Sequence, residues 1–358
     1  MASIEPRVAS RAAVERAYRR EPTGQLAAHI PGYYKGLYPI SPAPYTYGVG
    51  ATTQPVGPLY FVPMPARDLP ADAKLGSPRD QATDADQDYC FGHVGELYRV
   101  DDKEGLELVR PVVESIGDID RLPDPAQFGA HLVTAEMRAE AAERKKTQWL
   151  IGGVPSADLT INWPNGIQRM MEWVGSEPEL VAKYMDYTLR LCLAWLDVNA
   201  ALGVDEIGLA CCYGSASLLS PRMYRKLTDQ VHVPLIQEAH RHGIKMKIHQ
   251  CGNSRPNWQS IADQGFDAME TIDPLAGCTI PDAKRQIGDR VVLFGNVDTL
   301  TLATGTPADA IAETRRSLRE GMPGGGFVLG LGDTTVSRAT SLANLLAVRS
   351  TFEEYGWY

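Results

Sequence analysis

The 358-residue sequence lacks several features that mark common classes of protein. It contains no run of about 18 apolar residues, so we expect no membrane-spanning helix. The first residues contain no apolar segment of the kind that defines a secretory signal. Basic residues are not in excess, and the net charge of -9 argues against a broad surface for nucleic acids or anionic membranes. Six cysteines in a chain this long do not form a disulfide framework, so we expect free thiols and a cytoplasmic protein.

The composition is that of a globular protein, with 44% hydrophobic and 22% charged residues. From residue 148 onward, apolar runs alternate with helical patterns. We predict strands at 25–30, 149–154, 204–210, 245–249, 266–272, 290–295 and 326–331. We predict helices at 9–20, 166–174, 177–202, 221–242, 257–264, 280–288, 308–320 and 339–355. This alternation is typical of a parallel sheet in an α/β protein.

About eight strand–helix units in one chain favour a single (β/α)8 TIM barrel spanning residues 1–358. A doubly wound open sheet is the alternative, and it is weakened because no Gly-x-Gly-x-x-Gly turn follows the first strand. Residues 31–125 are rich in glycine, proline and tyrosine and are too long for a βα loop. We interpret them as an irregular excursion over the barrel mouth, with a dimer-contact extension as the alternative.

In a TIM barrel, the catalytic groups lie at the C-terminal ends of the strands. The polar residues and thiols predicted at these ends are His29, Cys211, Cys212, Tyr213, His249, Cys251, Glu270, Asp273, Asn296, Asp298 and Asp333. The candidates for catalysis are His29, Asp298 and Asp333, although Asp298 could instead cap the next helix. The candidates for substrate contact are Glu270, Asn296 and Tyr213.

The His-x-Cys pair formed by His249 and Cys251 is the clearest chemical signal. In extended backbone, residues two apart point to the same side, and imidazole and thiolate are preferred zinc ligands. A buried thiol beside a hydrogen-bonded histidine is the alternative interpretation. The preceding predicted strand ends at Cys211 and Cys212, so one of these thiols could complete a site. The alternative for this pair is a strand end packed against a helix, because adjacent residues face opposite ways.

Zinc held by three protein ligands keeps an open position that activates a bound group. A bound water would give hydrolysis. A bound substrate thiol or the ether oxygen of a methyl donor would give alkyl transfer.

Several segments together resemble the superfamily of uroporphyrinogen decarboxylase and the cobalamin-dependent methyltransferases, over nearly the whole chain. They are residues 10–24, 165–178, 217–221, the string His249-Gln250-Cys251-Gly252-Asn253, residues 288–298 and 305–307, Asn344, and Tyr355-Gly356. The resemblance implies a single (β/α)8 barrel with its site at the mouth.

The motifs point toward the methyltransferase branch and also depart from it. The Arg-Gln-Ala-Gly-Arg type of signature found in the decarboxylases is absent. The methyltransferases use His-x-Cys and a distant cysteine after the last strand as zinc ligands, and His249 and Cys251 match the first two. Residues 330–333 read Gly-Leu-Gly-Asp where the third ligand is expected. The third ligand would then be Cys212, Glu270 or Asp333, or the site would hold no metal.

The resemblance implies a zinc-dependent methyltransferase that moves a methyl group between a small methylated compound, such as a methyl ether, and a corrinoid. The corrinoid would arrive on a partner protein, because the chain has no cobalamin-binding Asp-x-His-x-x-Gly module. A homodimer is also compatible with the resemblance. The alternatives are a metal-independent decarboxylase or lyase, in which Asp298, Asp333 and His29 move protons, and a non-catalytic binding protein.

Overall fold

The computed structural model of the chain describes residues 11–29, 45–47, 89–91, 97–101, 105–110, 113–154, 166–333 and 340–358. Eight parallel strands form a curled sheet in the order β1-β11-β10-β9-β8-β7-β6-β2. They are β1 (Ala27–His29), β2 (Tyr45–Tyr47), β6 (Trp149–Gly153), β7 (Glu206–Ala210), β8 (Lys245–His249), β9 (Ala268–Glu270), β10 (Val292–Val297) and β11 (Phe327–Leu331). A separate antiparallel sheet contains β3 (Tyr89–Phe91), β4 (Leu97–Asp101) and β5 (Gly105–Arg110).

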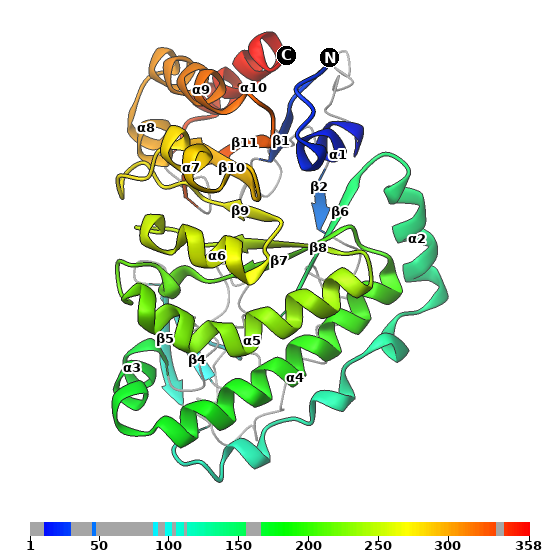
Figure 1. Cartoon of the computed structure of the whole chain (residues 1–358), viewed down its shortest axis with the longest axis vertical. Helices are drawn as coiled ribbons and strands as arrows, with labels where there is room; N and C mark the ends of the chain where they lie inside the picture. The colour runs from blue at the N-terminus through cyan, green and yellow to red at the C-terminus, as the bar shows by residue number, and fades with distance from the viewer. Residues whose placement is uncertain are drawn as a thin grey trace.

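Helices follow the curve of the main sheet from α9 and α10 through α7 and α6 to α5 and α4 (Figure 1). The α-helices are α1 (Arg11–Arg19), α2 (Ala135–Lys145), α3 (Gly166–Ser176), α4 (Pro178–Leu202), α5 (Pro221–Arg241), α6 (Trp258–Gln264), α7 (Ile280–Ile287), α8 (Thr299–Thr304), α9 (Pro307–Gly321) and α10 (Leu342–Tyr355). Short 3-10 turns span Ile119–Arg121, Pro125–Gln127, Ala130–Leu132, Cys212–Gly214 and Arg255–Asn257. None of the described helices combines the length and the apolar character needed to cross a membrane.

The strand order confirms the predicted α/β class and its parallel sheet. Neighbours follow the chain from β6 to β11 and then return to β1, whereas a doubly wound sheet reverses direction at a switch point. In the described residues, β1 and β2 are the two edges, and no ladder joins them. The closed barrel therefore remains a prediction.

The two faces of the sheet have different cores. The outer face packs against the helices through the larger hydrophobic cluster, which includes Ile207 of β7, Ile248 of β8 and Trp195 of α4. Gly152 allows α4 to approach β6, because a Cβ there would lie 1.8 Å from Oδ1 of Asn199. Asn199 uses its Nδ2 to donate to the backbone oxygen of Gly153 at 2.8 Å. The close contact between α4 and β6 therefore requires glycine at position 152.

The inner face is closed at the N-terminal ends of the strands by α1. Its Ala13, Val14 and Ala17 pack against inner-face side chains that include Trp149 and Phe294. At the start of α1, the Arg11 guanidinium pairs with both carboxylate oxygens of Asp205, at 2.6 and 2.7 Å. The candidate rim therefore lies at the opposite, C-terminal end of the strands.

Three expectations about elements were wrong or incomplete. The region 31–125 is not wholly irregular, because β2 joins the main sheet and β3–β5 form the second one. We also predicted that this region covers the barrel mouth, but most of its residues lie outside the described part of the structure. Helix α2 was not predicted, because Ala141 is its only buried residue and its apolar periodicity is weak. Helix α8 was not predicted, because it has six residues, three of them threonines with low helix propensity.

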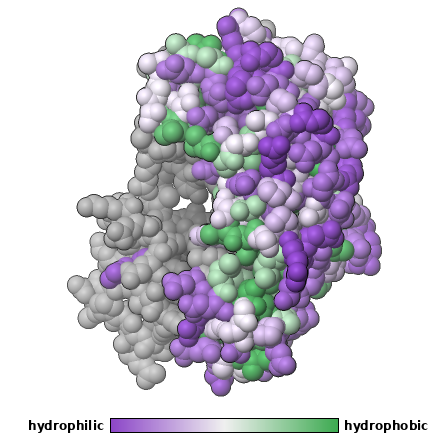
Figure 2. Space-filling view, turned by 60° about the vertical axis from the view of Figure 1, so that its left-hand side comes forward, coloured by the Kyte–Doolittle hydropathy of each residue, from purple (hydrophilic) through white to green (hydrophobic). Residues whose placement is uncertain are grey.

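The surface in Figure 2 is mainly hydrophilic, with hydrophobic side chains gathered in smaller patches through its middle. Large hydrophobic residues that are exposed include Leu218, Leu275 and Leu300. Each lies in a segment that follows the C-terminal end of a strand, β7, β9 or β10. The rim of the sheet at this end is therefore not wholly polar.

Candidate metal centre

The candidate site is built on the adjacent C-terminal ends of β7, β8 and β9. Ala210 pairs with His249 in the parallel ladder, and His249 pairs with Glu270. The hydrogen bonding continues past the strands, where the Cys211 amide donates to the His249 carbonyl at 2.7 Å and the Gln250 amide to the Glu270 carbonyl at 3.1 Å. The extended alternation thus persists through Gln250, so His249 and Cys251 share one side, as predicted.

Gly252 ends this extended segment and turns the chain. Its φ of +75° lies in the left-handed region that favours glycine. A Cβ at this position would lie 2.9 Å from Oγ of Ser217. The Gly252 amide donates to Oδ2 of Asp273 at 3.1 Å, while Oδ1 accepts from the Leu275 amide at 2.9 Å. Asp273 therefore stabilises the turn at Gly252 that follows Cys251.

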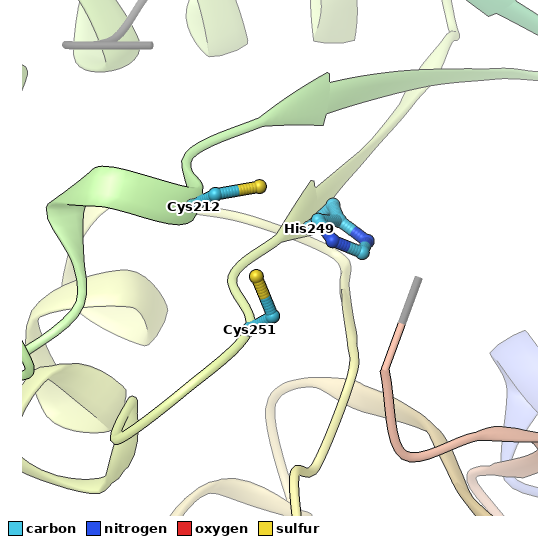
Figure 3. Close-up of side chains that lie close together, drawn as sticks. All are labelled: Cys212, His249 and Cys251. Atoms are coloured by element: carbon cyan, nitrogen blue, oxygen red, sulfur yellow. The ribbon is translucent and has the colours of Figure 1, made fainter. Parts of the chain in front are cut away.

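Cys212, His249 and Cys251 form one cluster of donor atoms. One sulfur or nitrogen atom from each residue lies within 4.8 Å of the other two. Figure 3 shows the three side chains turned toward a common space from the segment after β7, the end of β8 and the loop beyond it. His249 is buried, and the two cysteines are partly buried. Two thiols and one imidazole are the donor set that suits zinc, so the residues present fit the metal.

Glu270 holds the imidazole of His249, with 3.0 Å between Oε1 and Nδ1. Burial lowers the pKa of His249, but its hydrogen bonds with Cys251 and Glu270 outweigh this and raise the pKa overall. The hydrogen bond with Cys212 lowers the pKa of the Cys251 thiol, and His249 lowers it further against the effect of burial. The cluster therefore favours a thiolate beside a positive charge. A metal replaces the proton on Nε2: in the neutral imidazole, Nδ1–H donates to Glu270 and the Nε2 lone pair is free to bind, as in the carboxylate–histidine pairs of metal sites.

The two adjacent cysteines have different environments. Cys211 is fully buried, and its sulfur accepts a hydrogen bond from Nε2 of Gln250 at 3.6 Å. Cys212 instead starts the short 3-10 turn and belongs to the donor cluster. The packed strand end and the ligand were alternatives for the pair; the geometry places Cys211 in the packed strand end and Cys212 in the donor cluster, where its role as a ligand stays a prediction.

Two other predicted residues, Asp298 and Asn296, are not members of the donor cluster. Both carboxylate oxygens of Asp298 accept hydrogen bonds from the first turn of α8, through the amides of Leu300 and Thr301. Asn296 is buried, and its Oδ1 accepts from Arg316 of α9 at 2.9 Å. Asp298 is thus a helix cap, the alternative weighed for it, and Asn296 is held by an outer helix.

The three remaining candidate site residues are Tyr213, Asp333 and His29. Tyr213 is partly buried and packs against the larger hydrophobic cluster. Asp333 is exposed, and its charge acts to raise the pKa of the Cys251 thiol, although it is not a member of the donor cluster. The prediction for His29, the last residue of β1, concerns a side chain outside the described part of the structure.

The sequence reasoning missed two buried charged residues, Lys247 of β8 and Glu206 of β7. Lys247 is 3% exposed and Glu206 is fully buried. The signal was present, because Lys247 precedes His249 by two residues in a strand and must share its face. Nζ of Lys247 lies 3.1 Å from Oε1 of Glu206 and 2.7 Å from Oε2 of Glu270, the residue that contacts His249.

The parallel sheet with a thiol–imidazole cluster at its strand ends defines an α/β protein with a candidate metal centre. The family model for uroporphyrinogen decarboxylase (URO-D) matches residues 94–355. The chain therefore belongs to this family, as the sequence resemblance predicted.

Curated relatives of two activities are similar to the chain. A methylated-thiol–coenzyme M methyltransferase of Methanosarcina mazei is 28% identical over 185 residues, covering 51% of this chain and 47% of the relative. A methylcobamide:CoM methyltransferase of Methanosarcina barkeri is 24% identical and covers 75% and 78%. A uroporphyrinogen decarboxylase of Psychromonas ingrahamii is 28% identical and covers 64% and 66%. The match thus spans about half the length of the first of these relatives.

A solved methyltransferase from Methanosarcina mazei has the same fold. Its TM-score is 0.58 at 21% identity, and the match covers 73% of this chain and 76% of that one. The members of the family to which the chain is similar are thus enzymes, both methyltransferases and decarboxylases.

Proposed function

We propose that the protein is a zinc-dependent methyltransferase that moves a methyl group between a small methylated compound, such as a methyl ether, and a corrinoid. The corrinoid would be carried by a partner protein. The whole chain would act as one domain in the cytoplasm. Similarity to the two methyltransferases named above supports the reaction class.

The observation that carries this proposal is the donor cluster itself. Side-chain donors from Cys212, His249 and Cys251 lie within 4.8 Å of one another, at the strand ends where this fold places its chemistry. A decarboxylase that works without metal has no need for two thiols and an imidazole in one place. Cys212 would replace the cysteine that the methyltransferases carry after the last strand, where residues 330–333 of this chain contain none.

The residues of the site would have two roles, binding the metal and orienting a ligand. Cys212, His249 and Cys251 would bind the metal, and Glu270 would orient His249 through Nδ1. When bound, zinc polarises the leaving heteroatom of a methyl donor or lowers the pKa of an acceptor thiol. Partial burial of both cysteines leaves the cluster open to a small substrate.

The test is methyl transfer from free methylcobalamin to a panel of small thiols by the zinc-loaded protein, followed by the absorbance of methylcobalamin. We expect turnover that Cys251→Ala reduces by roughly 100-fold or more, because losing a ligand exceeds the cost of losing an outer contact. The matched control is Cys192→Ala, which removes a buried thiol of α4 outside the donor cluster.

Chelation distinguishes the alternative activity. The proposal expects turnover to stop when zinc is removed and to return when it is restored. Release of carbon dioxide from a carboxylated porphyrinogen that is unaffected by chelation would contradict it, and would support the metal-independent decarboxylase.

A further inference from the structure

A chain of buried charges runs along the inner face of the sheet to His249. The ammonium of Lys247 lies between two carboxylates, 3.1 Å from Oε1 of Glu206 and 2.7 Å from Oε2 of Glu270. The other oxygen of Glu270 contacts Nδ1 of His249 at 3.0 Å. The order of contacts is therefore Glu206, Lys247, Glu270 and His249, and we call these four residues the inner charge chain.

The far end of the inner charge chain is anchored by neutral donors. Oε2 of Glu206 accepts hydrogen bonds from the Tyr18 hydroxyl at 2.6 Å and from Nε1 of Trp149 at 2.9 Å. These two rings also stack on each other, with centroids 5.3 Å apart. The Lys247 ammonium lies 4.6 Å from the centre of the Phe294 ring. The position of Lys247 is thus fixed by aromatic residues and by α1.

Strand register explains why these groups meet. Lys247 pairs with Gly208 and with Ala268, so no large side chain stands beside it on the same face. Glu206 and Glu270 occupy the two diagonal positions, one at the start of β7 and one at the end of β9. A long cation at position 247 can therefore reach both carboxylates.

Removing these charged side chains from water costs free energy, so stability alone does not explain their presence. Burying an ion pair often gives no more stability than packing apolar groups of the same volume, whereas removing one partner is strongly destabilising. Glu270, unlike Glu206 and Lys247, retains some exposure, with 20% of its side chain accessible. Without Lys247, its carboxylate would be free to leave His249 and turn to solvent or to a cation at the mouth.

We propose that Lys247 is a positioning residue for the candidate metal site. By holding one oxygen of Glu270, it directs the other oxygen to Nδ1–H of His249 and so presents the Nε2 lone pair. The proposal rests on the metal site of the proposed function, but it does not depend on methyl transfer. Lys247 would act through Glu270, whose other oxygen contacts the imidazole of His249.

The experiment compares two variants that each lose a lysine of the same strand. Glu206→Gln/Lys247→Met removes the ion pair without leaving one buried charge alone, and the amide oxygen of the introduced glutamine is still able to accept from Trp149 or Tyr18. The control is Lys245→Met, which also removes a lysine of β8 that pairs with an aspartate, Asp267, at 2.7 Å. Circular dichroism and thermal unfolding establish that both variants are folded.

The first readout is the dissociation constant for zinc, by competition with a chromophoric chelator. We expect the double variant to bind zinc about 10- to 100-fold more weakly than the wild type, the usual effect of losing an outer partner of a ligand. Lys245→Met should bind within about twofold. A folded double variant with the wild-type dissociation constant would overturn the proposal.

The second readout needs no metal. In the metal-free wild type and in Lys245→Met, the Nδ1–H of His249 should give a slowly exchanging proton signal in nitrogen-15 NMR, because Glu270 accepts its hydrogen bond. The signal should be lost in the double variant, and its persistence there would overturn the proposal. A wild type that binds no zinc but shows this difference would refute the proposed function and leave the positioning role standing.

Discussion

His232 lies fully buried on α5, with its ring edge-on to that of Phe266 at a centroid distance of 5.3 Å. Its Nδ1 lies 3.4 Å from Oε1 of Gln264, and its Nε2 has no hydrogen-bond partner among the residues that the structure describes. Burial lowers its pKa to about 4, although Gln264 acts in the opposite direction. His232 is therefore neutral in the folded protein near pH 7.

This environment predicts a loss of stability in mild acid. The unfolded chain binds a proton at His232 below about pH 6.5, whereas the folded chain binds it only near pH 4. The stabilising contribution is complete above about pH 6.5 and is lost as the pH falls toward 4. Between pH 7.5 and 5.0, the wild type should lose about 2 kcal/mol more unfolding free energy than His232→Gln.

Urea unfolding at the two pH values measures this difference. The matched variant is His242→Gln, which makes the same substitution at a histidine whose side chain is 40% exposed. Equal pH dependence in the wild type and in His232→Gln would contradict the assignment.

For individual side chains, the sequence predicts the side of a strand on which a residue lies better than it predicts the residues that it contacts. The spacing of His249 and Cys251 was enough to place both on one side of a strand. The choice between Cys211 and Cys212 required the actual turn, since the 3-10 segment that starts at Cys212 sets where its sulfur points. Glu270 was expected to contact substrate, and its contacts with His249 and Lys247 depend on register between strands.

Helix α8 depends on a single capping side chain. Asp298 accepts from the Leu300 and Thr301 amides and from the Thr301 hydroxyl at 2.6 Å. We expect Asp298→Ala to lower the unfolding free energy by about 1 kcal/mol, and Asp298→Asn to lose much less, since asparagine is an equally good cap. Thermal or urea unfolding of the two variants measures this.

The same pair of variants separates capping from catalysis. If Asp298 only caps α8, Asp298→Asn should keep both its stability and its turnover. A stable Asp298→Asn variant without turnover would show that the carboxylate itself takes part in the reaction, as first expected from its place at the rim.

Among the elements, those with a clear apolar pattern were predictable, including the three-residue strands β1 and β9, whereas β2 was not. The bounds of β8 agree with the prediction, and α5 begins at Pro221 after the Ser220 cap as expected. Strand β2 has only three residues, too few to show an alternating pattern. Its place in the sheet comes from pairing with β6, a long-range contact that no local signal reports.

At the scale of the whole molecule, the packed contacts and the candidate metal centre lie at opposite ends of the strands. At their N-terminal ends, α1 closes the inner face through Arg11, Tyr18 and its apolar residues. At their C-terminal ends, the donor cluster is partly open. The inner charge chain connects the two ends. Alternating strands and helices were enough to predict this polarity, while closure of the barrel between β1 and β2 stays a prediction.

The central claim is that Cys212 completes a zinc site with His249 and Cys251. Its most direct test is the zinc content of the purified, tag-free protein compared with Cys212→Ser and Cys211→Ser. These two variants make the same chemical change at adjacent positions, one in the donor cluster and one in the core. We predict about one zinc per chain in the wild type and in Cys211→Ser, and little or none in Cys212→Ser. A wild type without zinc, or a Cys212→Ser variant that retains it fully, would contradict the claim.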